Sequence, residues 1–96
     1  QPGDSLLDIG CGQGILAHHI TEEISYTGID LSPTFIKEAK KINKGNFILA
    51  DATKKLPLNE KFSHSIAILS LQNMEHPDRA LKNIATHLKP GGKALI

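Results

Sequence analysis

The most informative segment of this chain is Leu6-Leu7-Asp8-Ile9-Gly10-Cys11-Gly12-Gln13-Gly14. An apolar run ends in an acidic residue and in three alternating glycines, and an apolar segment with helical spacing follows. This order is typical of a buried strand, a tight turn and the first turn of a helix. The turn suits a nucleotide-like ligand, because glycines let it approach the backbone and the helix end presents free N–H groups.

The glycine spacing distinguishes two kinds of nucleotide site. A dinucleotide fingerprint requires G-x-G-x-x-G, in which the third glycine lets the helix pack closely on the strand. Gly10 and Gly12 occupy the first two positions, but Ile15 stands at the third. With Asp8 two residues ahead and Gly14 completing G-x-G-x-G, the segment resembles motif I of the class I S-adenosylmethionine-dependent methyltransferases.

Length and composition limit the chain to one small domain over residues 1–96, with enough apolar residues to form a core. The net charge of +1 argues neither for nor against a nucleic-acid partner. No apolar run is long enough to span a membrane, and no signal-peptide pattern is present. The single Cys11 excludes an internal disulfide and suits a reducing compartment, so a cytoplasmic location is expected. Because its only methionine is Met74 and its last residues, 93–96, have the pattern of a strand with nothing after it, we expect a core truncated at both ends.

Five apolar runs with strand character alternate with helical patterns along the chain. Strands are expected over 5–9, 26–30, 47–50 and 65–70 and from residue 93, and helices over 14–23 and 33–43 and from residue 77. The glycines of Lys89-Pro90-Gly91-Gly92 would allow a left-handed exit from the last helix. The alternation predicts an α/β fold: a doubly wound, mostly parallel Rossmann-like sheet in the order 3-2-1-4-5, with helices on both faces. Its ligand crevice would lie between strands one and four.

An acidic residue stands at the carboxyl end of each of the first three expected strands, so Asp8, Asp30 and Asp51 should share one edge of the sheet. Asp30 lies 20 residues after Gly10, where an acid can accept both hydroxyls of a ribose. Its alternative role is to cap the next helix, although Ser32 before Pro33 already suits that role. Asp51 is alternatively an ordinary turn residue. Asp8 could hold the glycine-rich turn by accepting its N–H groups.

The methyltransferase resemblance assigns further roles to these residues. It implies that Asp51 meets the adenine amine, that the backbone N–H of Ala52 meets the ring, and that Asp8 lies near the methionine part of the donor. The segment from Leu69 to Leu81 and the ending Leu88-Lys89-Pro90-Gly91-Gly92 also resemble the family. Gln72 would then lie beside the crevice, near the transferring methyl.

His76 is the one candidate general base at this edge, and its alternative is a solvated loop residue. The chain departs from the family pattern at Ser63, where members often have Asp, and at Asn73, where many have His. Ser63 is interpreted as structural, whereas Asn73 offers no base at its position.

The resemblance covers nearly the whole chain and is strongest to the small-molecule and quinone-type branch. It implies an S-adenosylmethionine-dependent enzyme that methylates a small-molecule acceptor. No metal is expected, because His64 and His87 do not have the spacing of metal ligands. The expected cofactor contacts are Asp8, Gly10, Cys11, Gly12, Gly14, Asp30, Leu31, Asp51, Ala52, Leu69 and Gln72. Within this set, the Cys11 side chain is interpreted as packing and not as a nucleophile. The alternatives are a non-catalytic cofactor-binding or scaffold domain and an NAD(P)-binding oxidoreductase domain; the acceptor and the oligomeric state are not indicated.

Overall fold

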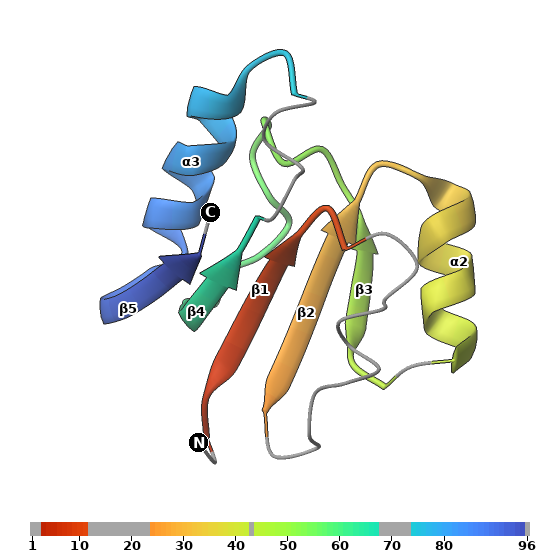
Figure 1. Ribbon diagram of the computed structural model, residues 1–96, viewed down its shortest axis with the longest axis horizontal. Coiled ribbons are helices and arrows are strands. Elements are labelled where there is room, and N and C mark those ends of the chain that lie inside the picture. The colour runs from red at the N-terminus through yellow and green to blue at the C-terminus, as the bar shows by residue number, and fades with distance from the viewer. Residues whose placement is uncertain (1–2, 12–23, 43, 68–73, 96) are drawn as a thin grey trace.

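The computed structural model of the chain describes residues 3–11, 24–42, 44–67 and 74–95 (Figure 1). These residues form β1 (Ser5–Ile9), β2 (Ser25–Asp30), α2 (Pro33–Ile42), β3 (Asn46–Leu49), β4 (Phe62–Ile66), α3 (Pro77–Thr86) and β5 (Leu88–Leu95). The helix expected over residues 14–23 lies outside the described residues. So do four of the expected cofactor contacts, namely Gly12, Gly14, Leu69 and Gln72.

All five strands lie in one sheet in the order β3-β2-β1-β4-β5, and every neighbouring pair is parallel. This arrangement confirms the predicted doubly wound α/β fold. In the central strand, Leu7 pairs with Thr27 of β2 on one side and with Ser65 of β4 on the other. Because the strands are parallel, their carboxyl ends meet at a single edge, which is where a ligand binds in such sheets.

The apolar side chains divide between the two faces of the sheet, because successive residues of a strand point to opposite sides. Leu7 packs in one cluster with Ala80 and Ile84 of α3. Leu6 packs in the other with Ile36 of α2. The two helices therefore cover opposite faces, as predicted (Figure 1). Neither helix, nor any other in the described part of the chain, has the length and apolarity needed to cross a membrane.

The first turn of α2 confirms the predicted start signal. Ser32 precedes the helix, and its hydroxyl oxygen accepts the N–H of Phe35 at 3.2 Å. Its carbonyl oxygen accepts the N–H of Ile36 at 3.0 Å. Pro33 follows at the first helical position, where a missing N–H costs nothing. This cap fixes the direction in which the chain leaves the carboxyl end of β2.

The structure corrects the predicted start of β4. The strand begins at Phe62 rather than at residue 65, and the expected positions 68–70 lie outside the described residues. Two of the three added residues, Ser63 and His64, are polar, and an apolar pattern therefore missed them. Ser63 replaces part of the backbone ladder, because its N–H donates to the Ser5 hydroxyl oxygen at 3.0 Å and its own hydroxyl donates to the Ser5 carbonyl at 2.9 Å. Ser63 thus has the structural role expected of it.

The exit from α3 is also corrected. The helix ends at Thr86, and His87 follows with a φ of −99°, so no left-handed residue closes the helix. Lys89, Pro90 and Gly91 lie inside β5 instead. Gly91 does have a positive φ of 78°, and the β4–β5 register shifts between Phe62 and His64. The glycine therefore serves an irregularity within the strand pair rather than a helix cap.

Candidate functional site

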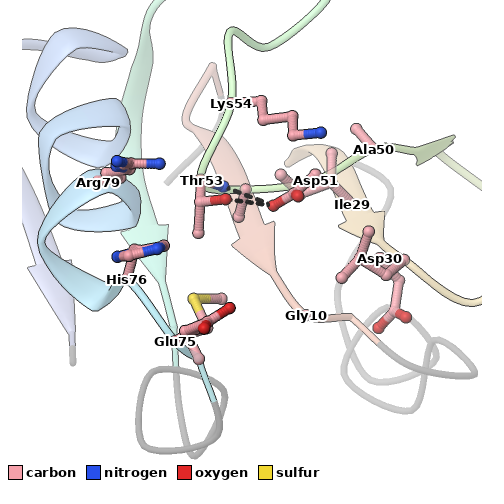
Figure 2. A pocket seen from close by; sticks show the side chains of 13 residues that line it. Gly10, Ile29, Asp30, Ala50, Asp51, Thr53, Lys54, Glu75, His76 and Arg79 are labelled. Carbon is pink, nitrogen blue, oxygen red and sulfur yellow. Dashed lines mark hydrogen bonds between the residues drawn. The ribbon is translucent and has the colours of Figure 1, made fainter.

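A pocket of about 540 Å³ lies at the carboxyl edge of the sheet, between the ends of β1, β2 and β3 and the start of α3 (Figure 2). Its volume is within the range of small-molecule and cofactor sites. The lining residues are Gly10, Ile29, Asp30, Leu31, Ala50, Asp51, Ala52, Thr53, Lys54, Met74, Glu75, His76 and Arg79. The edge is the predicted one, although residues 68–73, on the connection from β4 to α3, lie outside the described residues.

The turn after β1 begins at Gly10, whose φ of 74° favours glycine. Its N–H donates to the carbonyl oxygen of Ile29 at 2.8 Å, and the N–H of Cys11 donates to the same oxygen at 3.0 Å. Both amides are thus committed to β2 and are not available to a ligand. What Gly10 offers the pocket is a surface without a side chain, which allows close approach to the backbone.

Asp30 ends β2 and lines the pocket, as predicted. Its Oδ1 accepts the backbone N–H of Ser32 at 2.9 Å. Asp30 therefore stabilises the turn before α2, which is its alternative role, and also lies beside the pocket. This hydrogen bond orients the carboxylate, which is an acceptor for the hydroxyl or amine groups of a ligand.

Asp51 follows β3 and lines the same pocket (Figure 2). Its Oδ1 accepts two hydrogen bonds from Thr53, one from the backbone N–H at 2.9 Å and one from the hydroxyl at 2.7 Å. These bonds, with the nearby charge of Lys54, lower the pKa of Asp51 below its ordinary value of 3.8. Asp51 is thus a fixed carboxylate at neutral pH, able to accept hydrogen bonds but not to donate them.

Two other expected contacts, Leu31 and Ala52, also line the pocket. The side chain of Leu31 is 67% exposed, so it offers an apolar surface at the mouth of the pocket. Ala52 is buried and packs in the cluster beneath α3. The pocket therefore has apolar surfaces beside its carboxylates, as sites for flat, partly polar ligands commonly have.

Asp8 is buried and hydrogen-bonded to the neighbouring strand. It is buried within β1, is not among the residues that line the pocket, and its Oδ2 accepts a hydrogen bond from the Tyr26 hydroxyl at 2.5 Å. Two amides of the glycine-rich turn, those of Gly10 and Cys11, donate to Ile29 of β2 and not to Asp8, and the rest of the turn lies outside the described residues. Burial, together with the charge of Asp30, raises the pKa of Asp8 to about 6, although the Tyr26 hydrogen bond opposes that rise.

Cys11 packs beneath the turn and is buried against β2. Burial, reinforced by the negative charges of Asp8 and Asp30, raises the pKa of its thiol to about 12. A thiol held so firmly protonated is a poor nucleophile. The low reactivity of the thiol agrees with the interpretation that the Cys11 side chain serves packing. Cys11 is also not among the residues that line the pocket.

The far wall of the pocket comes from α3 and from the segment just before it. His76 precedes the helix, is exposed, lines the pocket, and makes no side-chain cap hydrogen bond (Figure 2). Arg79, one turn further on, and Lys54 on the opposite loop add positive charge that the sequence did not predict. The spacing of Arg79 three residues after His76 was the available signal, because such residues share a helix face.

The sequence of this chain is similar to those of known proteins. A family model described as a methyltransferase domain matches residues 7–96. An O-methyltransferase of Pyrenophora dematioidea is 41% identical over 99% of this chain and 39% of its own length. The ubiquinone/menaquinone biosynthesis C-methyltransferase UbiE of Chromobacterium violaceum is 33% identical over 98% of this chain and 42% of its own. The chain therefore spans well under half the length of these curated relatives.

Solved structures show the same fold. A TehB-like SAM-dependent methyltransferase from Corynebacterium glutamicum matches with a TM-score of 0.86 and 25% identity, over 98% of this chain and 54% of its own. The [4+2]-cyclase SpnF matches with a TM-score of 0.85 and 34% identity, over 96% of this chain and 37% of its own. SpnF is named for a cyclisation, so this fold is also found in a protein that is not named as a methyltransferase.

Proposed function

The chain belongs to the methyltransferase-domain family, and we therefore propose that it binds S-adenosylmethionine at the pocket beside Asp30 and Asp51 and transfers the methyl group of this donor to a small molecule. The observation that carries the proposal is the position of these two acids. They stand at the ends of neighbouring parallel strands and line one pocket.

The chemistry of the pocket fits an adenosine group. Ribose hydroxyls and the adenine amine are hydrogen-bond donors, and carboxylates accept from them. Asp30 would accept the ribose hydroxyls, and Asp51, kept ionised by Thr53, would accept the amine. Leu31 would cover the adenine ring, and the backbone of Ala52 would lie at its edge. The remaining expected contacts, Gly12, Gly14, Leu69 and Gln72, belong to the proposal as predictions from sequence alone.

The residues of this chain would act mainly by positioning. When bound, S-adenosylmethionine supplies a methyl group on a sulfonium centre, which is already activated for displacement. The pocket residues therefore have to hold the donor in one orientation and exclude water from it. His76 would take a proton from the acceptor if the acceptor has to lose one, since its side chain lines the pocket and is exposed.

The relatives support a small-molecule acceptor without fixing the atom that is methylated. One is named for oxygen and the other for carbon methylation. A cytoplasmic location is part of the proposal and is supported by a single, buried cysteine that forms no disulfide. The SpnF likeness supports a second candidate, in which the site binds the cofactor while the chain performs another reaction or none.

Titration of the full-length protein with S-adenosylhomocysteine, the demethylated product, tests the proposed site. We expect micromolar binding of this compound and none of NADH, because the third fingerprint glycine is replaced by Ile15. Asp30→Ala should weaken binding about tenfold or more, since it removes charge-assisted hydrogen bonds. Glu60→Ala is the matched control, because Glu60 is an exposed carboxylate outside the pocket lining.

Two results would overturn the proposal. One is a folded wild-type protein that does not bind S-adenosylhomocysteine, and the other is equal loss of affinity in the Asp30 and Glu60 variants. Binding of the product without transfer from a radiolabelled donor to any of a panel of small-molecule acceptors would favour the second candidate instead.

A further inference from the structure

The loop between β3 and β4 forms one side of the pocket but has no helix or strand of its own. It carries Asp51, Thr53 and Lys54 to the pocket. Within the loop, the N–H of Lys54 donates to the Asp51 carbonyl at 3.1 Å. An irregular segment of this kind keeps one conformation only if its backbone polar groups find fixed partners elsewhere.

Asn83 of α3 supplies such partners. Its side-chain Nδ2 donates to the carbonyl oxygen of Ala52 at 2.6 Å and to that of Lys54 at 2.8 Å. One amide group thus uses both of its hydrogens on the same loop. Asn83 lies one turn beyond Arg79, so α3 lines the pocket with its first turn and holds the loop with a later one.

The hydrogen bond from Asn83 to Ala52 is linked through one peptide unit to Asp51 in the pocket. The carbonyl of Ala52 and the N–H of Thr53 belong to the same planar peptide unit, so fixing one fixes the other. That N–H donates to Oδ1 of Asp51. A chain of hydrogen bonds therefore runs from the Asn83 amide through one peptide plane to the Asp51 carboxylate, and each bond polarises the next.

We infer that Asn83 is a positioning residue for this pocket, which sets the orientation of the Asp51 carboxylate through the peptide that joins Ala52 to Thr53. The inference rests on the proposed function, because it takes adenosine to be the ligand group that donates a hydrogen bond to Asp51. It adds that affinity for the adenosine group depends on a side chain of α3 that is not among the pocket-lining residues.

The test is a double-mutant cycle on the full-length protein, with S-adenosylhomocysteine as the titrant. Asn83→Ala removes both donors, and Asn83→Asp keeps the shape but replaces the donors with a charge that opposes the two carbonyls. Each should weaken binding about tenfold, the equivalent of about one well-formed hydrogen bond at the ligand. Lys82→Ala is the control, since Lys82 is the exposed neighbour of Asn83 on α3.

The cycle separates positioning from a merely structural role. In an Asp51→Ala background, the effect of Asn83→Ala on affinity should disappear, because no carboxylate is left to orient. Thermal unfolding without ligand is measured in parallel, so that all titrations are made where each variant is folded. If Asn83→Ala unfolds the protein, the Asn83→Asp arm of the same cycle gives the answer.

Three outcomes contradict the inference: unchanged affinity in both Asn83 variants, a loss equal to that in Lys82→Ala, or the same fold-loss with and without Asp51. These differ from failure of the proposed function, which appears as a wild-type protein that does not bind S-adenosylhomocysteine at all.

Discussion

Asp8 carries a charge that the fold compensates only in part. Burial raises its pKa to about 6, whereas the Tyr26 hydroxyl donates to it and opposes the rise. In the parallel register Tyr26 pairs with Leu6, so its long side chain must reach two residues along β1 to meet Asp8. The sequence could predict the acid at the strand end, but not this pairing, which depends on a tyrosine in the neighbouring strand.

The raised pKa of Asp8 predicts a pH dependence of stability. Because the folded value of about 6 exceeds the ordinary 3.8, the folded state holds the proton more tightly, and ionising Asp8 costs stability as pH rises through that window. Asp8→Asn keeps an acceptor for Tyr26 without the charge. Its free energy of unfolding, relative to wild type, should therefore rise between pH 4 and 6 by up to about 3 kcal/mol and then stay constant. Urea unfolding across this range measures it, and a difference independent of pH would contradict the account.

Among the helices and strands, polar residues and close packing determine those ends of the elements that a hydrophobic pattern does not predict. After Phe62, β4 continues with Ser63 and His64, which pair with residues of β1 although they are polar. The start of α2 was predictable, because Ser32 and Pro33 are local signals. The exit from α3 was not, since the glycines that suggested it serve the pairing of β4 with β5.

The contact of the glycine-rich turn with β2 gives a prediction at this scale. A Cβ added at Gly28 would lie 2.8 Å from the Cys11 Cβ and 2.9 Å from its sulfur. Gly28→Ala should therefore destabilise the protein by about 2 kcal/mol, as overpacking does. Combining it with Cys11→Gly should recover more of the loss than combining it with Cys11→Ala, because Cys11→Ala removes the sulfur contact but keeps the Cβ. Urea unfolding of the three single variants and the two double variants checks this, and equal recovery by both Cys11 substitutions would contradict it.

At the scale of the molecule, the sequence predicted the sheet order, the parallel pairing and a helix on each face, and the structure confirms all three. Alternation of apolar strands with helical patterns determines these features, so they can be predicted without tertiary contacts. Asp30 and Asp51 were predicted beside the pocket because parallel strands end at one edge. The position of Lys54 at the pocket and the hydrogen bonds of Asn83 depend on where α3 meets the β3–β4 loop, which no local pattern contains.

The central claim is that S-adenosylmethionine binds at the carboxyl edge of β1, β2 and β3. The most direct measurement is the change in backbone amide NMR shifts when S-adenosylhomocysteine is added to isotope-labelled full-length protein. The account predicts the largest changes at Asp30, Leu31, Ala52 and Thr53, around the pocket beside α3. Changes centred instead on Ser65, Ile66 and Ala94, which line a separate cavity of about 510 Å³, would contradict it.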